Sequence, residues 1–150
     1  MVNANFVNGM VLAPKHVEVV AGLIFRDGRL LACQRRESGA FPLKWEFPGG
    51  KVEPGESFEE CLIREIAEEL DIQVAVGQQF GVVKHSFTHF KMRMVVFMCS
   101  FVSGTPKAIG CDTFAWVTRD ELESYAFPVS DRNVITALRR GDYKMTFIEE

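Results

Sequence analysis

Hydrophobic and polar positions along the chain first indicate β-strands. Residues 16–25 and 30–35 are rich in apolar and β-branched side chains, and Asp27-Gly28 between them is a pair typical of a tight hairpin turn. Residues 72–83, 87–102 and 113–117 predict further strands. The stretch from Met92 to Cys99 is almost uniformly apolar, so we expect that strand to be buried on both faces.

Two segments have the spacing of helices instead. From Phe58 to Leu70, apolar side chains recur every fourth residue, and Ser57 stands in front of them as an N-cap. Residues 131–140 predict a closing helix. Strands that surround one helix and precede another indicate an α/β domain with one main sheet and flanking helices. We expect residues 1–15 to be a loose lead-in and residues 16–150 to form the single domain.

Composition excludes several classes of protein. The chain has 150 residues, which suits one domain, and its net charge of −3 does not suit a protein that coats nucleic acid. No apolar run is long enough for a membrane helix. The spacing of the four cysteines, Cys33, Cys61, Cys99 and Cys111, fits neither zinc nor a disulfide scaffold, so we expect reduced thiols and a cytoplasmic location. We expect the protein to be a monomer or homodimer.

Acidic residues are concentrated in one stretch. Between Glu46 and Glu69 there are eight glutamates and only two basic residues, Lys51 and Arg64, so this stretch carries −6 within a chain of −3. A solvated acidic face is the ordinary interpretation of such a cluster. The alternative is that several of these carboxylates bind one ligand together.

Three of the glutamates occupy one arc of the predicted helix. Glu65, Glu68 and Glu69 are spaced i, i+3 and i+4, at which like charges repel one another. An all-oxygen set suits a hard cation such as Mg²⁺ or Mn²⁺, and Mg²⁺ usually shares its shell with water and substrate phosphates. A glycine turn, Gly49-Gly50, precedes the helix. The pattern therefore favours phosphate chemistry.

The whole segment resembles the Nudix box, G-x5-E-x7-R-E-U-x-E-E-x-G-U. The match begins at Gly50, includes Glu56, and continues as Arg64-Glu65-Ile66-Ala67-Glu68-Glu69-Leu70-Asp71-Ile72. Only the last glycine of the motif differs, since Asp71 stands there. The preceding residues 45–53 are similar to the approach to the box in MutT-type enzymes and CTP pyrophosphohydrolases. The resemblance implies the Nudix fold, a mixed β-sheet between helices in an α/β/α sandwich.

The resemblance also implies an activity and assigns roles. MutT-like enzymes hydrolyse a nucleoside triphosphate to the monophosphate and pyrophosphate with the help of Mg²⁺ or Mn²⁺. The implied roles are metal binding by Gly49, Glu65, Glu68 and Glu69, an outer-shell role for Glu56, and orientation of the carboxylates by Arg64. The implied partner is a nucleoside triphosphate, with no stable nucleic acid and no membrane.

Further positions match those that bind the nucleotide. Arg36, Phe47 and Asp131 match residues of the base pocket in MutT-like proteins, while Gly50 and Lys51 are placed for phosphate contacts. An exposed lysine of the turn is an equal alternative for Lys51. Asp131 has an alternative role as the N-cap of the last helix. For the general base two alternatives stay open: Asp112 in the loop before the last strand, or a glutamate of the box such as Glu68 or Glu65.

Residues 85–90, His-Ser-Phe-Thr-His-Phe, resemble a stretch of the C-terminal domain of the adenine glycosylase MutY, a Nudix relative that reads 8-oxoguanine in DNA. In that comparison Phe87, Thr88 and His89 occupy recognition positions, although packing within a strand would explain them too. The resemblance favours 8-oxo-dGTP as substrate. The alternatives are CTP or another pyrimidine triphosphate, then ADP-ribose, and a non-catalytic module that recognises 8-oxoguanine in DNA.

Overall fold

The computed structural model describes the chain except for residues 1–4, 8–9, 13–14, 142–145 and 150. Its elements follow the alternation of strands and helices that the sequence predicts. In chain order they are β1 (Asn5–Val7), β2 (Met10–Leu12), β3 (Lys15–Arg26), β4 (Arg29–Gln34), β5 (Trp45–Glu46), β6 (Gly49–Lys51), α1 (Phe58–Leu70), β7 (Gln73–Ser86), β8 (Phe90–Ser103), β9 (Thr113–Thr118), the 3-10 helix η1 (Arg119–Ser124), α2 (Val129–Arg139) and β10 (Thr146–Glu149).

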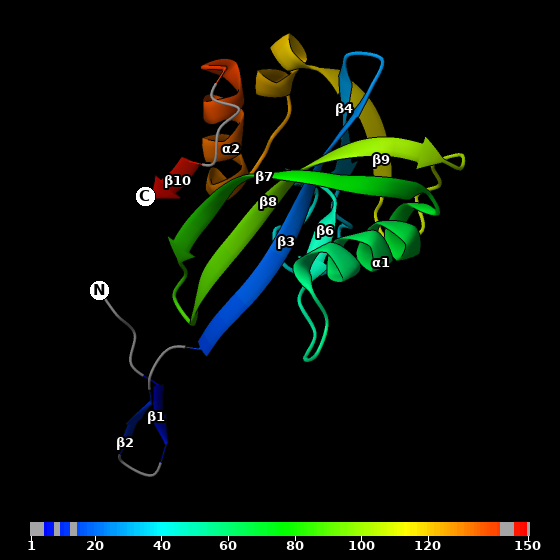
Figure 1. The fold of residues 1–150 in the computed structure, drawn as a ribbon. Helices are drawn as coiled ribbons and strands as arrows, with labels where there is room; N and C mark the ends of the chain where they lie inside the picture. The colour runs from blue at the N-terminus through cyan, green and yellow to red at the C-terminus, as the bar shows by residue number, and fades with distance from the viewer. Residues whose placement is uncertain (1–4, 8–9, 13–14, 142–145, 150) are drawn as a thin grey trace.

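One mixed sheet forms the centre of the molecule (Figure 1). Its strand order is β10-β7-β8-β3-β4-β5, with β6 paired to β3 and β9 paired to β4. Strands β3 and β8 run parallel along eleven residue pairs, whereas β7 and β8 form an antiparallel hairpin. The long β3 therefore connects the hairpin β7–β8 on one side with β4 and β6 on the other.

The sheet separates two hydrophobic cores because neighbouring residues of a strand point to opposite faces. On β3, Ala21 and Leu23 pack into the core that includes α2. Val20 and Ile24 pack into the core that includes α1. The two helices therefore lie on opposite faces of the sheet (Figure 1), as the flanking helices of an α/β/α sandwich do.

The prediction for the apolar strand is confirmed. On β8, Met94 and Val96 belong to the core under α2, while Val95 and Phe97 belong to the core under α1. All four are at most 5% exposed. A strand that buries both faces needs no alternation, and this accounts for the continuous apolar run in its sequence.

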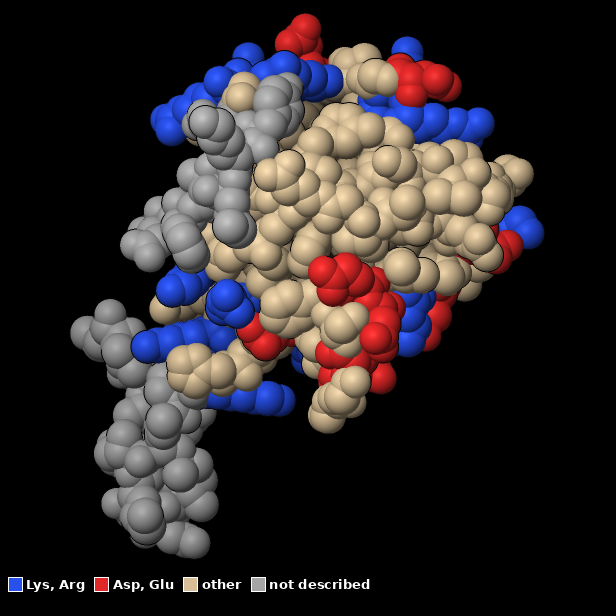
Figure 2. Space-filling model, in the orientation of Figure 1, with Lys and Arg blue, Asp and Glu red and all other residues tan. Residues whose placement is uncertain are grey.

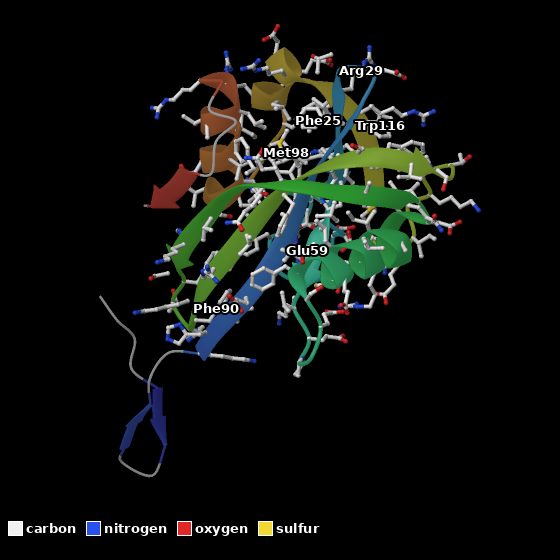
Figure 3. The ribbon with its side chains drawn as sticks, viewed as in Figure 1. Phe25, Arg29, Glu59, Phe90, Met98 and Trp116 are labelled. Carbon is white, nitrogen blue, oxygen red and sulfur yellow. The ribbon has the colours of Figure 1, made fainter. Side chains whose placement is uncertain are left out.

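The predicted hairpin is also present. β3 pairs with β4 at Phe25↔Leu30 and Arg26↔Arg29, around the Asp-Gly turn, and Phe25 and Arg29 lie close together on these strands in Figure 3. Beyond this point the two strands separate: β3 continues against β6, whereas β4, which pairs with β9 along its other edge, continues against β5. This separation leaves room below the hairpin for the segment that carries the glycine turn.

Helix α1 has the bounds that its periodicity predicts. It begins after Ser57, whose Oγ accepts a hydrogen bond from the Glu60 N–H at 3.1 Å, and its inner face buries Leu62, Ile66 and Leu70. Asp71 ends it in the left-handed conformation, with φ of 55° and a backbone hydrogen bond to Ala67. This is the conformation that the family's glycine adopts without strain, and an aspartate fills it here.

Other elements depart from the prediction. α2 begins at Val129, two residues before the expected start, and the sequence did not predict η1 or β10. Of the expected lead-in, residues 5–7 and 10–12 form a separate two-stranded antiparallel sheet, while 1–4, 8–9 and 13–14 lie outside the described residues. The boundary at residues 15/16 stays a prediction. None of the described helices has the length and apolar content needed to cross a membrane.

Candidate active site

A cavity of about 590 Å³ runs along one side of β3 from α1 to α2. Its α1 end is lined by Glu65 and Glu69 together with the glycine turn, and its α2 end by Asp131. Apolar side chains, among them Phe47, Phe87 and Met94, line the length between these ends. Its volume is in the range of small-molecule and cofactor pockets, and its two ends differ sharply in polarity.

The Arg64 guanidinium organises the acidic end. Its Nη2 lies 2.7 Å from Glu56, and its Nη1 lies 3.1 Å from Glu65 and 3.3 Å from Glu68. These contacts connect the turn before α1 with two turns of the helix. Hydrogen bonds from Arg64 and from the Glu53 N–H lower the pKa of Glu56 to about 2, so this carboxylate remains charged. Figure 2 shows the acidic side chains gathered over this part of the molecule.

The glycine turn packs directly against the helix carboxylates. β6 pairs antiparallel with β3, with Val20 opposite Gly50, and this pairing brings the turn under α1. A Cβ added at position 50 would lie 2.4 Å from the carboxyl carbon of Glu65 and 2.6 Å from one of its oxygens. The space that a side chain would take is therefore filled by the Glu65 carboxylate, which explains the glycine physically.

Glu69 lies deeper than the other helix carboxylates. Burial, and then the nearby charges of Glu46 and Glu65, raise its pKa to about 8. Burial also raises the pKa of Glu65 itself. Two carboxylates that resist ionisation next to each other mark a place with an excess of negative charge, which a cation would relieve.

The donor set fits a hard divalent cation. Glu65, Glu69 and Gly49 line the same end of the cavity, and all three offer oxygen atoms. As the side chains stand, no three described His, Cys, Asp or Glu residues converge closely enough to hold an ion, since Arg64 engages two of the helix glutamates. Glu68 is exposed and Glu56 faces Arg64, so a full ligand set requires these side chains to turn.

Asp131 lies at the opposite end, in the first turn of α2. It is only 6% exposed, and burial together with the charge of Glu46 raises its pKa to about 7 despite a hydrogen bond from the Phe47 backbone. The alternative role as N-cap is wrong, because α2 begins at Val129 and Pro128 occupies the cap position. Next to it, the rings of Phe47 and Phe127 stack at 5.1 Å.

Two further residues in the cavity were missed from the sequence. Arg35 at the end of β4 donates a hydrogen bond to Glu46 on β5 at 2.7 Å, and both line the cavity. Burial raises the pKa of Glu46, and its charge acts on both Glu69 and Asp131. The sequence signal was present, since Glu46 belongs to the acidic stretch but not to the motif.

The remaining predicted residues divide between the cavity and the surface outside it. Phe87 and Lys51 line the cavity, and Phe87 stacks on Phe90 at 4.6 Å. Arg36 and Asp112 are exposed outside the described lining: Arg36 donates to the Ile109 carbonyl, and the Asp112 N–H donates to the Gln34 carbonyl. Thr88 and His89 are exposed in the β7–β8 turn.

A mixed sheet between two helices, with a glycine turn pressed against glutamates of one helix, defines a MutT-like hydrolase. The chain belongs to the Nudix family, since the model of the NUDIX domain matches residues 19–137. It is 32% identical to the CTP pyrophosphohydrolase of Escherichia coli over 82% of this chain and 91% of the relative. It is 35% identical to a putative 8-oxo-dGTP diphosphatase 2 of Mycobacterium tuberculosis, over 81% and 87%.

A solved structure agrees with this family. The crystal structure of the MutT protein from Methanosarcina mazei Go1 matches with a TM-score of 0.80 at 28% identity, covering 89% of this chain and 99% of that one. The fold prediction is therefore confirmed, and the protein is a Nudix hydrolase.

The raised pKa of Glu69 predicts how stability depends on pH without metal. The native state holds a proton on Glu69 up to about pH 8, whereas the unfolded chain releases it near pH 4.3. Stability is therefore lost as pH rises across this window. We expect Glu69→Gln to stabilise the protein relative to wild type by on the order of 1 kcal/mol more at pH 8 than at pH 5.

Urea unfolding in EDTA at the two pH values measures this difference. Glu60→Gln, at an exposed position of the same helix, is the control. Its free energy of unfolding should differ from that of wild type by the same small amount at both pH values. A Glu69→Gln difference that does not change with pH would contradict the assigned environment.

Proposed function

We propose that this protein hydrolyses a nucleoside triphosphate to the monophosphate and pyrophosphate, and that 8-oxo-dGTP is its preferred substrate. One observation carries the proposal: a single cavity joins the Nudix carboxylates and glycine turn to two further acidic residues, the half-buried Glu46 and the buried Asp131. The first end suits a polyphosphate with its cations, and the second suits a polar base edge. Between these two ends the cavity is lined by apolar side chains, which suit the flat rings of a base.

Glu65 and Glu69 with the Gly49 carbonyl would hold the divalent cations, and Glu68 and Glu56 would complete the ligand set or support it. Bound Mg²⁺ or Mn²⁺ would neutralise phosphate charge and activate water for attack on phosphorus. Arg64 keeps these carboxylates in place through its ion pairs with Glu56, Glu65 and Glu68. The chain's own contribution is thus a preformed, negatively charged end of the cavity.

Basic side chains along the cavity are suited to the substrate's phosphates. Lys51 follows the glycine turn directly and lines the cavity. Arg35, directly after β4, also lines the cavity, and its guanidinium is held in place by hydrogen bonds to Glu46 and, at 2.7 Å, to the Ala40 carbonyl. A triphosphate carries charge that these cations can share with the metal site.

For the proton of the attacking water, we propose a glutamate of the box. Glu65 lines the cavity, and Glu68 lies one turn further along the same helix, whereas Asp112 is held on the outer loop by its backbone bond to Gln34. A general base must come within hydrogen-bond reach of the water it activates. The geometry favours the box glutamates over Asp112.

The acidic pair at the α2 end supports recognition of guanine. The base presents N–H donors on its N1 and N2 atoms and an acceptor at O6, so its reader must accept twice and donate once. Asp131 has a pKa of about 7, raised by burial and by the charge of Glu46, so its carboxyl is partly protonated near neutral pH and can both donate and accept. Glu46 supplies further acceptor oxygens, so the two side chains together offer that combination, and oxidised guanine adds a further donor at N7.

A pyrimidine triphosphate is the second candidate. The relative from Escherichia coli, 32% identical, is named CTP pyrophosphohydrolase. Cytosine presents one donor and two acceptors on its pairing edge, and a protonated Asp131 could pair with the donor and with one of the acceptors. ADP-ribose has no supporting observation. A non-catalytic module for 8-oxoguanine in DNA would need neither Arg64 nor the glutamates that it holds.

Glu69→Gln removes a carboxylate from the centre of the metal end while keeping its volume. We expect release of pyrophosphate in Mg²⁺ to fall by at least about 100-fold, the scale of losses at metal sites, whereas Glu60→Gln keeps the wild-type rate. The assay compares kcat/KM for 8-oxo-dGTP, dGTP, CTP, dCTP, 5-methyl-dCTP and ADP-ribose. The proposal expects 8-oxo-dGTP to rank first.

Two results would overturn this. If 8-oxo-dGTP is not favoured over dGTP, the proposed substrate is wrong, although the reaction class survives. If no nucleotide releases pyrophosphate and the protein binds 8-oxoguanine DNA instead, the chain is a binding module.

Asp131→Asn tests the base end separately. The substitution keeps the shape but removes the ionisable proton, so kcat/KM for 8-oxo-dGTP should fall by roughly 10- to 100-fold through KM, the scale of one good base contact. Asp120→Asn, at an exposed position on η1, serves as control. An unchanged KM for 8-oxo-dGTP would remove Asp131 from base recognition.

We propose a cytoplasmic location for this activity. The four cysteines are free thiols, as expected in a reducing compartment. A nucleoside triphosphate is the partner that the cavity suits.

A further inference from the structure

We propose that Cys33 and Cys111 form a reversible disulfide under peroxide, and that this bond switches the hydrolase off. Neither residue belongs to the Nudix motif. The pair lies directly behind the acidic end of the cavity, where a change in backbone position reaches the carboxylates. Only the activity readout depends on the proposed function; the disulfide does not.

The two thiols meet across a single pair of strands. Cys33 lies on β4, and Cys111 lies just before β9, the strand that pairs with β4. The Asp112 N–H donates to the Gln34 carbonyl at 2.9 Å, so the residues that follow the two cysteines are hydrogen-bonded to each other. The neighbouring thiol is the largest influence on the pKa of each cysteine, raising that of Cys33 and lowering that of Cys111, and both side chains belong to one buried core. Neighbouring thiols on hydrogen-bonded backbone need little movement to join.

The pair contacts the site from two directions. Cys33 is the register partner of Glu46 on β5. On the other side, Ile109 and Gly110 are the two residues before Cys111, and the N–H groups of both donate to the Glu69 carbonyl at 3.0 Å. A Cβ at Gly110 would lie 3.0 Å from the Glu69 Cγ. The loop therefore packs against Glu69 with no room to spare.

A disulfide would move this loop. Two neighbouring thiol sulfur atoms are further apart than two bonded ones, so bond formation draws residue 111 toward β4. Gly110 is tied to Glu69 by hydrogen bond and by contact, so the displacement reaches the side chain proposed as metal ligand. We expect the oxidised protein to hold Mn²⁺ or Mg²⁺ less tightly.

The oxidation balances with one hydroperoxide molecule. The Cys111 sulfur attacks a peroxide oxygen, the O–O bond breaks, and water leaves a sulfenic acid behind. The Cys33 sulfur then attacks the Cys111 sulfur and expels a second water that carries the Cys33 thiol hydrogen. Two thiols lose two electrons, and hydrogen peroxide becomes two waters. The neighbouring Cys33 thiol lowers the pKa of Cys111, consistent with Cys111 as the thiol that reacts first.

The other two cysteines serve as internal comparison. Cys99 on β8 is buried in the same core, and burial raises its pKa to about 12, so it should resist peroxide. Cys61 on α1 donates to the Lys51 carbonyl at 3.3 Å. If burial alone determined which cysteines are oxidised, Cys61 and Cys99 would react as Cys33 does.

The test uses the full chain, reduced with dithiothreitol, desalted and treated with stoichiometric hydrogen peroxide. Intact mass should fall by two hydrogens, and peptide mapping without reduction should show the Cys33–Cys111 link. In the same sample, pyrophosphate release and Mn²⁺ affinity should fall by about tenfold or more, the scale of disturbed outer-shell contacts, and return with dithiothreitol. Cys111→Ser and Cys33→Ser should keep their rate after peroxide, whereas Cys99→Ala should lose it as wild type does.

The proposal is overturned if peroxide leaves Cys33 and Cys111 unlinked, or if Cys111→Ser loses activity like wild type. A linked protein whose rate and Mn²⁺ affinity stay within about twofold of the reduced form overturns the switch, since a disturbed outer shell costs tenfold or more. If the reduced protein hydrolyses no nucleotide, the proposed function fails, while the mass map and Mn²⁺ affinity still decide on the disulfide. Wild type alone supplies the mapping result, so the decision does not depend on a serine variant folding.

Discussion

Carboxylates from the turn before α1 and from two turns of that helix stand around the guanidinium of Arg64. Without a cation between them, the negative charges of Glu56, Glu65 and Glu68 would repel one another. With it, the turn, the helix and the β6 glycines form one rigid unit against β3. The candidate metal end and the position of the cavity both depend on this ion-pair cluster.

The sheet converts that local unit into a site with two ends. β3 presents one face to the core under α1 and the other to the core under α2, so a cavity along it reaches from the box glutamates to Asp131. Glu46 lies between, and its charge influences both ends. The charge of Glu46 is therefore felt electrostatically at both the metal end and the base end.

Local patterns in the sequence were enough for local features. The periodicity and cap of α1, the Asp-Gly hairpin and the doubly buried strand all depend on neighbours along the chain, and the structure has each of them. Contacts between distant segments were not predictable in this way. Arg35 rather than Arg36 lines the cavity because β4 pairs with β5, and Asp131 lies inside α2 because the helix starts at Val129. The proximity of Cys33 to Cys111 likewise depends on a contact between distant segments, the hydrogen bond from the Asp112 N–H to the Gln34 carbonyl.

We propose above all that the Gly50 turn positions the Glu65 carboxylate to bind a divalent cation. Mn²⁺ titration followed by electron paramagnetic resonance, on wild type and Gly50→Ala, tests it directly. Because the added Cβ would lie 2.4 Å from the Glu65 carboxyl carbon, the carboxylate must move, and Mn²⁺ affinity should fall by roughly 10- to 100-fold while the variant stays folded. A folded Gly50→Ala protein that binds Mn²⁺ as tightly as wild type would contradict the account.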